Sequence, residues 1–273
     1  MTAQLHIETG LRANKTYLSD CYFTTPYKVA DITEDRSENK LHLMLMSSSP
    51  GILDGDKYNV KIGLAENTSL QLQTQSYQRL FNMKKGALQS IEVRMSEGSS
   101  FTYLPHPTVP HKASNFFAAN NIYLSQNCRL IWGEVLTCGR KLTGEEFAFS
   151  KFHSITKVFL KGKLMVKENL LIEPSGIDVH AIGQLEGYTH QASLIFIGEA
   201  DVSSIISYIN NNLNDEENIC FGVSSLPVNG LIIRIMGFKA EQLFTCLKSI
   251  GNHLSTIRIS DNIKVDKMNI YAS

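Results

Sequence analysis

The feature that most constrains the fold is a two-residue alternation of apolar and polar side chains, which recurs in short segments up to about residue 192. These segments run for about five to eight residues and stop at Gly, Asn, Ser or Pro. Examples of the strands predicted in this way are 41–46, 58–64, 69–75, 91–95, 121–124, 130–136, 155–160 and 169–172. Regularly spaced strands without helical periodicity between them predict a mainly antiparallel or coiled β architecture rather than βαβ units. The segments contain no exact repeat, so a simple solenoid is not predicted.

Beyond residue 192 the period changes to that of a helix with one buried face. A strand at 193–198 is followed by Asp201, a helix-capping residue type, and by a helix over 201–213. The apolar residues at helical spacing in it are Val202, Ile205, Ile206, Ile209 and Leu213. The remaining predicted elements are strands 219–225 and 231–237 and a helix 240–250 that Gly251 ends. The order β, α, β, β, α resembles a split βαβ unit.

The predicted fold class is therefore mainly β, a large multi-stranded architecture of coiled or helical β layers with a small C-terminal α+β portion. We expect a β-rich scaffold portion over 1–192 and an α+β portion with two helices over 193–273. No Pro/Gly/Ser-rich or charge-blocked stretch separates them, so we expect the second to pack on the first in one structural unit.

Charge and composition exclude several classes of partner. Among 273 residues, 26 Lys and Arg balance 26 Asp and Glu, which leaves no long-range attraction to nucleic acid or to an anionic membrane. The sequence contains no apolar run of the roughly 18 residues that a spanning helix needs, and its start is polar. We expect a cytoplasmic protein. Five scattered cysteines without a CxxC pair are typical of reduced thiols.

Familiar catalytic and metal-binding motifs are missing from the sequence. It has no GxSxG, HExxH, GxxxxGK[ST] or strand-linked GxGxxG, so any GTP hydrolysis would belong to a partner. His106 and His111 flank a Pro-rich run, but five residues of extended chain place them too far apart for easy shared chelation. We predict no permanent metal site.

The densest turn signal lies at 47–56. Pro50 and Gly51 suit the centre of a type II turn, Gly55 permits a second positive φ, and Asp54 and Asp56 can form Asx turns. Two interpretations stay open. The segment is either a structural turn, or a turn that fixes Asp56 so that its carboxylate points into a polar passage.

Carboxylates at two other places invite a functional interpretation. Glu134 lies in the apolar strand 130–136, where it must be paired or hydrated if it faces inward and is unremarkable if it faces outward. Glu145 and Glu146 could suggest an acid/base pair, but adjacent residues of a strand point to opposite faces.

Four segments, in this order, resemble the signature of the urease accessory protein UreD/UreH family. Segment 48–56, SSPGILDGD, resembles the family's SPGGxxxGD element, and 72–81, LQTQSYQRLF, resembles its TTQAxxKVYR element. Segment 104–107, LPHP, resembles LPxP, while 132–140 and 144–147 resemble WxExxxxGR…GExF. The chain departs from these elements at Ile52, which replaces a glycine, and at 79–82, which replaces the basic KVYR ending.

The resemblance implies a β-rich chaperone or scaffold for metallocentre assembly and no enzyme. Such a protein binds a UreF-type partner that recruits a UreG-type GTPase, and it docks on the urease apoprotein for GTP-dependent nickel insertion. Nickel is then transient cargo, not a bound cofactor, and passes through a polar internal tunnel. The residues at or near matching tunnel positions are Asp56, Glu134, Gln78 and Lys167. The structural residues of the matched motifs are Pro50, Gly51, Gly55, Gly139 and Arg140.

The alternative function is a β-rich hydrolase that uses scattered carboxylates such as Asp56 and Glu134. A scaffold should expose a large apolar docking patch, whereas an enzyme should show one deep cleft with perturbed carboxylates. For the scaffold, the C-terminal helices and nearby strand edges are the expected docking surface.

Overall fold

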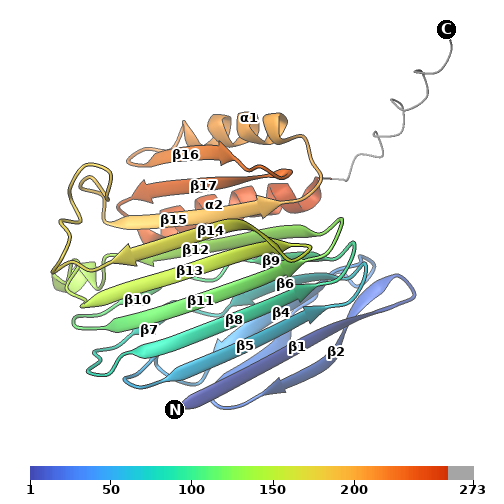
Figure 1. The fold of residues 1–273 in the computed structure, drawn as a ribbon, viewed down its shortest axis with the longest axis horizontal. Coiled ribbons are helices and arrows are strands. Elements are labelled where there is room, and N and C mark those ends of the chain that lie inside the picture. The colour runs from blue at the N-terminus through green and yellow to red at the C-terminus, as the bar shows by residue number, and fades with distance from the viewer. Residues whose placement is uncertain (258–273) are drawn as a thin grey trace, which may run out of the picture.

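The computed structural model describes residues 1–257, which form two large β-sheets with two α-helices against one of them (Figure 1). Sheet A has seven strands in the order β14-β13-β11-β8-β5-β1-β2. Their bounds are β1 (Thr2–Arg12), β2 (Lys15–Phe23), β5 (Lys57–Leu64), β8 (Ala87–Met95), β11 (Asn115–Leu124), β13 (Lys151–Leu160) and β14 (Lys163–Ile172). The mainly β class and the C-terminal helices predicted from the sequence are confirmed.

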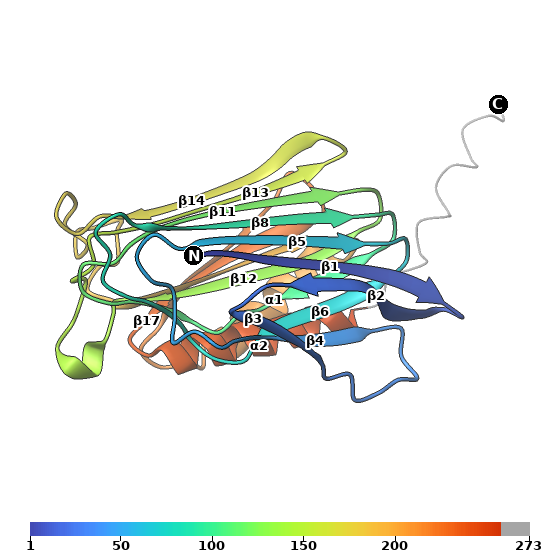
Figure 2. The ribbon, with the colours of Figure 1, turned by 90° about the horizontal axis from the view of Figure 1, so that it is seen from below.

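Sheet B has ten strands, eight of them in the order β16-β17-β15-β12-β9-β6-β4-β3. These are β3 (Tyr27–Asp31), β4 (Leu41–Ser47), β6 (Ser69–Thr74), β9 (Ser100–Tyr103), β12 (Arg129–Thr137), β15 (His190–Ile197), β16 (Cys220–Ser225) and β17 (Gly230–Gly237). The short β7 (Gln78–Leu80) and β10 (Thr108–Pro110) pair with each other, and β10 also pairs with β12. The sheets lie face to face (Figure 2).

The chain coils between the two sheets from β4 to β13, because each of β5, β8, β11 and β13 in sheet A is preceded by one or two strands of sheet B. Strands β5, β8, β11 and β13 are therefore parallel neighbours in sheet A, and β4, β6, β9 and β12 are parallel neighbours in sheet B. The prediction of a coiled β architecture is right. Antiparallel pairing occurs at β1–β2 and β13–β14 in sheet A, and at β3–β4 and along β12–β15–β17–β16 in sheet B. Alternation fixes which side chains are buried, but the direction of a partner strand depends on where each connection crosses.

The main core lies between the sheets and consists of the alternate residues that the period of two predicts. In β11, every second residue from Phe116 to Leu124 is buried, and their neighbours face outward. The same alternation holds in β1, where Ala3, Leu5 and Ile7 are almost fully buried. Burial of these faces supplies most of the stabilisation of the two layers.

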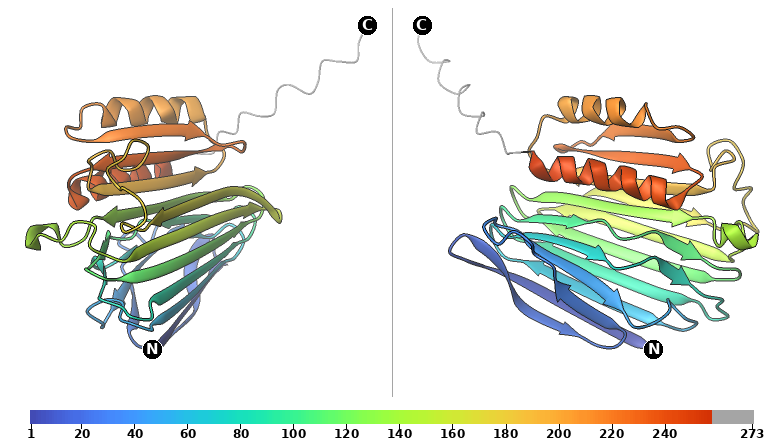
Figure 3. Two further views of the ribbon diagram at one scale, coloured as in Figure 1. Left: turned by 60° about the vertical axis from the view of Figure 1, so that its left-hand side comes forward. Right: turned by 180° about the vertical axis from the view of Figure 1, so that it is seen from behind.

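A second core joins the outer face of sheet B to helices α1 (Val202–Leu213) and α2 (Ala240–Thr256). The predicted cap is confirmed, since Asp201 Oδ1 accepts from the Ser203 backbone N–H at 3.0 Å. Strands β15, β17 and β16 continue sheet B beyond β12, and α2 lies across this part of the sheet (Figure 3, right). No helix within residues 1–257 is long and apolar enough to cross a membrane.

The predicted end of α2 at Gly251 is wrong, because the helix continues to Thr256. A Cβ at Gly251 would lie 2.5 Å from Leu104 Cδ1, and one at Gly133 would lie 2.6 Å from Leu104 Cδ2. The two glycines let α2 and β12 close around the Leu104 side chain. Gly251 is therefore a packing residue, and close approach has overridden its helix-stopping tendency.

The expected apolar docking surface on the C-terminal helices is also not observed. Both helices bury their apolar faces against sheet B, and no large hydrophobic side chain of α1 or α2 is exposed. The exposed apolar residues of the described chain lie elsewhere, on strands of sheet A that include β1 and β2, and on connecting segments, where Leu142 and Ile182 are almost fully exposed.

Candidate functional site

A cavity of about 260 Å³ lies between the two sheets. Sheet B contributes Trp132 and Glu134 to its wall, and sheet A contributes Asn120 and Ser154. The loops that follow β4, β6 and β9 complete the lining at one end, where Gln78 and His106 lie. The cavity is thus lined by both polar and apolar side chains and lies inside the main core. Glu134, which was assigned to a polar passage from the sequence, is part of its wall.

Glu134 faces inward and is held by four neutral side-chain donors. Its Oε1 accepts from Asn120 Nδ2, Trp132 Nε1 and Thr156 Oγ1, each at 3.0 Å. Its Oε2 accepts from Ser154 Oγ at 3.1 Å. These contacts show that Glu134 faces inward, one of the two orientations that the sequence left open. Hydroxyl, indole and amide donors take the place of the water molecules that an exposed carboxylate would bind.

The charge of Glu134 is not balanced by a cation within the described chain. Burial raises the pKa of the Glu134 carboxyl above its ordinary value, the hydrogen bonds lower it, and the nearby Glu168 raises it. The residual accessible surface of Glu134 faces the cavity. Beside it, the buried Asn120 Oδ1 has no hydrogen-bond donor among residues 1–257. Two acceptors without a positive partner therefore lie together at the wall.

Asp56 is buried, but it stands behind the cavity wall. Its Oδ2 accepts from the Leu53 backbone N–H at 2.9 Å and from the Tyr58 hydroxyl at 3.4 Å, and Tyr58 itself lines the cavity. The Met1 ammonium lies 3.0 Å from Asp56 Oδ1. Asp56 and Glu134 are thus connected to the same cavity, Glu134 directly and Asp56 through one tyrosine hydroxyl.

The turn that positions Asp56 differs from the predicted one. Gly51 does not adopt a positive φ, so a type II turn centred on Pro50 and Gly51 is wrong. The turn falls at Leu53–Asp56, where Gly55 has φ +77° and the Asp56 N–H donates to the Leu53 carbonyl at 3.1 Å.

Gly51 is needed for a close approach instead. A Cβ there would lie 2.3 Å from the Arg79 carbonyl oxygen, and the Ile52 N–H donates to that oxygen at 2.8 Å. The predicted Asx turns are also absent. Asp54 Oδ1 accepts from the backbone N–H groups of Lys85 and Gly86, so this turn is joined to a segment far away in sequence.

The two remaining predicted passage residues are placed differently. Gln78 lines the cavity, donating to Gln89 Oε1 at 2.8 Å and accepting from Thr108 Oγ1 at 3.3 Å. Lys167 is exposed on the outer side of β14, directly opposite Lys157. Its neighbour Glu168 faces sheet B and accepts twice from Arg234 Nη2, at 2.7 and 2.9 Å. Glu168 was not identified from the sequence. Because neighbouring residues of a strand point to opposite faces, one of Lys167 and Glu168 had to point inward, and this signal could have found it.

The loop after β12 is held by an ion pair, which explains the GR…GE spacing. Arg140 Nε donates to Glu145 Oε2 at 2.9 Å, and Arg140 Nη2 donates to Glu145 Oε1. This pairing with Arg140 lowers the pKa of Glu145 to about 2. A Cβ at Gly139, which has φ +123°, would lie 2.9 Å from the Glu145 carbonyl oxygen. Glu145 and Glu146 are loop residues rather than strand residues.

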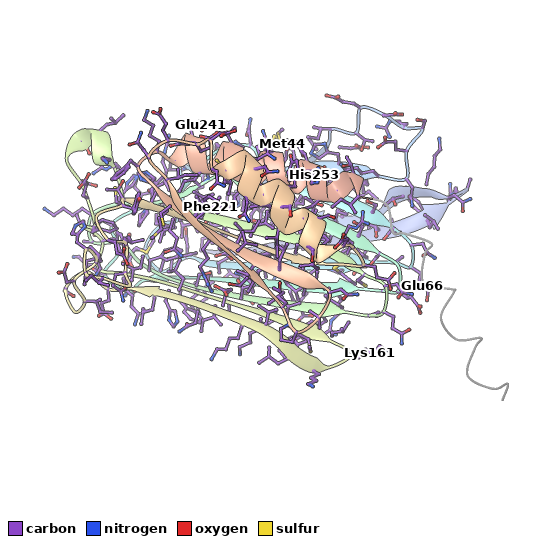
Figure 4. All side chains as sticks on the ribbon, turned by 90° about the horizontal axis from the view of Figure 1, so that it is seen from above. Met44, Glu66, Lys161, Phe221, Glu241 and His253 are labelled. Atoms are coloured by element: carbon purple, nitrogen blue, oxygen red, sulfur yellow. The ribbon has the colours of Figure 1, made fainter. Side chains whose placement is uncertain are left out.

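The cavity mouth is tied to helix α2. The Tyr77 hydroxyl donates to Glu241 Oε2 at 2.8 Å, and the His106 ring packs on Phe244 with centroids 4.6 Å apart. Glu241 is labelled on α2 in Figure 4. Burial, followed by this hydrogen bond, raises the pKa of Tyr77 to about 12. His106 also contacts Thr74 Oγ1, and no group of three or more His, Cys, Asp or Glu side chains in the described part could hold a metal ion together.

Comparison with known proteins gives one consistent result. The family model described as UreD urease accessory protein matches residues 1–264. A Flavobacterium johnsoniae protein named urease accessory protein UreD is 47% identical over 97% of this chain and 96% of its own length. Proteins of the same name from Acetivibrio thermocellus and Haemophilus influenzae are 33% and 34% identical, over 92% and 94% of this chain and 97% and 100% of their own lengths.

Proposed function

The chain belongs to the UreD family of urease accessory proteins, and we propose that it is a scaffold that assists nickel insertion into the urease apoprotein. Family membership places it in urease maturation and makes it an accessory protein rather than the β-rich hydrolase of the alternative hypothesis. The finer steps of the proposal concern the cavity, the cargo and the partners.

The observation that carries the nickel proposal is the Glu134 carboxylate in the wall of the cavity. Its four hydrogen-bond donors are neutral, so they orient the carboxylate without cancelling its charge. The adjacent Asn120 oxygen offers a second acceptor. A divalent cation with retained waters would be attracted to such a site and would still leave it, because two protein oxygens are far fewer than a full coordination shell.

The lining of the cavity suggests a route for the cargo. One end is formed by Gln78 of β7 and the loop residue His106, and the lining continues past Glu134 to Gln191 and Ser193 of β15. Ser193 pairs with Arg234, the partner of Glu168, so a second carboxylate stands close to that end. Asp56 contributes through Tyr58 at the side of the route. In this proposal nickel ions are passing cargo, and the chain keeps no resident cofactor.

The proposed assembly requires partners for the steps that this chain does not perform. The sequence lacks a phosphate-binding loop, so GTP hydrolysis falls to a UreG-type GTPase recruited through a UreF-type protein. The complex would work in the cytoplasm, where the urease apoprotein is made.

The test of this proposal is reconstitution. The chain, a UreF-type protein, a UreG-type GTPase and nickel-free urease are mixed with nickel and GTP, and urease activity and bound nickel are measured. We expect activation only when this chain is present. Equal activation without it would refute the scaffold role, and activation with unchanged nickel content in urease would refute the delivery role.

A further inference from the structure

The outer face of sheet A is uncovered over its whole width. Both helices lie on the far side of sheet B, so that no described element covers sheet A from outside (Figure 2). In Figure 4 Lys161, at the turn joining β13 to β14, lies on the opposite side of the molecule from Glu241 and His253 of α2. Parallel sheets are normally covered on both faces, so this exposed parallel face is unusual.

Three adjacent strands of this face, β11, β13 and β14, expose an apolar and aromatic surface. Tyr123 and Phe159 stack with ring centroids 5.0 Å apart, and Leu164, opposite Phe159, is 44% exposed. Phe117 packs edge-on against His153, and Leu171, opposite His153, is 36% exposed. We call this three-strand outer surface the β11–β14 face.

Two lysines lie in the middle of the β11–β14 face. Lys157 of β13 is directly opposite Lys167 of β14, and neither forms an ion pair within residues 1–257. β11 and β13 contain no acidic residue, and the one carboxylate of β14, Glu168, points inward to Arg234. Like charges directly opposite one another destabilise a sheet. The pair therefore works against folding and creates a positive centre, beside Asn121, between the two apolar parts of the face.

We propose that the β11–β14 face is the docking surface for the urease apoprotein, through acidic side chains that lie among apolar residues on that partner. This rests on the proposed function. An apoprotein that has not yet received its divalent cations carries ligand carboxylates whose negative charge no metal neutralises. Lysines attract such negative charge and do not bind the cation themselves. The face includes β14, whose Glu168 points inward to Arg234, the residue that pairs with Ser193 in the cavity lining. A second copy of this chain fits poorly, because two such faces would oppose lysine to lysine.

The experiment measures the affinity of nickel-free urease for the chain in its complex with the UreF-type partner. The variant Lys157→Glu/Lys167→Glu keeps a like-charged pair with reversed sign, so its stability should match that of the wild type. Lys57→Glu is the matched control, because Lys57 is exposed on β5, three strands from β13 in the same sheet. We expect about tenfold weaker binding for the double variant, unchanged binding for the control, and an affinity that falls with added salt.

A single variant separates docking from folding. Lys157→Glu places opposite charges across β13 and β14, so its unfolding temperature should rise while its affinity for urease falls. Equal urease affinity for wild type and the double variant would overturn the inference. Weakened binding of the UreF-type protein alone, or loss of self-association alone, would assign the face to another partner and also overturn it. The proposed function is judged separately, by activation of urease with the wild-type chain.

Discussion

The indole Nε1–H of Trp132 donates a 3.0 Å hydrogen bond to Glu134 Oε1. Trp132 is the one tryptophan in the sequence, so its fluorescence reports on the carboxylate that faces the cavity. The two residues lie two positions apart on the inward face of β12, and Tyr103 packs on the indole with centroids 4.7 Å apart. This arrangement gives the chain an internal probe of cation entry.

Nickel should quench the fluorescence of Trp132 when it reaches Glu134, because the ion would lie next to the group that holds the indole. Titration of the wild-type chain with Ni²⁺ should give saturable quenching, and Glu134→Gln should quench much less at the same concentrations. Mg²⁺, which parts with its waters reluctantly, serves as the control ion. Identical quenching curves for wild type and Glu134→Gln would show that nickel does not visit this carboxylate.

Loss of the passage carboxylates should lower nickel delivery and leave assembly intact. Glu134→Ala and Asp56→Ala proteins should still bind the UreF-type partner and urease, yet yield urease with less nickel. Because Asp56 also accepts from the Leu53 N–H, its removal should cost about 1–3 kcal/mol of stability as well. Nickel in urease is measured by atomic emission, and Asp54→Ala, at an exposed carboxylate in the same turn, is the control. Loss of binding in parallel with activation would make the residues structural.

The pH dependence of stability should carry the signature of Glu134. Its pKa is raised in the folded chain above the ordinary value of 4.5, so the folded state binds the proton more tightly than the unfolded state. The resulting stabilisation is complete below pH 4.5 and is lost as pH rises through the raised pKa. Relative to Glu134→Gln, which does not titrate, the wild type should therefore lose unfolding free energy over this interval. Thermal melts at a series of pH values, compared between the two proteins, check the sign.

Two glycines of one turn should respond differently to alanine. Gly51→Ala forces a Cβ to within 2.3 Å of the Arg79 carbonyl oxygen and should cost about 3 kcal/mol or more. Gly55→Ala meets no atom within 4 Å and strains only its φ of +77°, which should cost roughly 1–2 kcal/mol. Urea unfolding measures both. A larger loss for Gly55→Ala would mean that the 48–56 segment does not pack on residue 79 as the structure has it.

The alternation and capping patterns were enough to predict both helices and eleven of the described strands, while β1, β2, β3, β7, β9 and β10 were not among the strands named. The named strands all appear, although β8, β11, β13 and β14 begin earlier than predicted, and Asp201 caps α1 as expected. β1 shows the same alternation in the sequence, with Ala3, Leu5 and Ile7 inward, so its signal was present although it was not among the predicted strands. These features are local, because side-chain direction along a strand and caps within a turn depend on nearest neighbours.

What only the tertiary structure decided is which distant residues meet. Glu134 could have faced either side until Asn120, Thr156 and Ser154 of sheet A were placed opposite it. The register of β14 put Glu168 inward and Lys167 outward, against the predicted position. The parallel direction of the strands and the passage of α2 through Gly251 have the same origin. The register between strands and the close approach of two backbones depend on how whole faces of the sheets and helices pack. This packing is the result of many contacts together, so no single segment of the sequence encodes it.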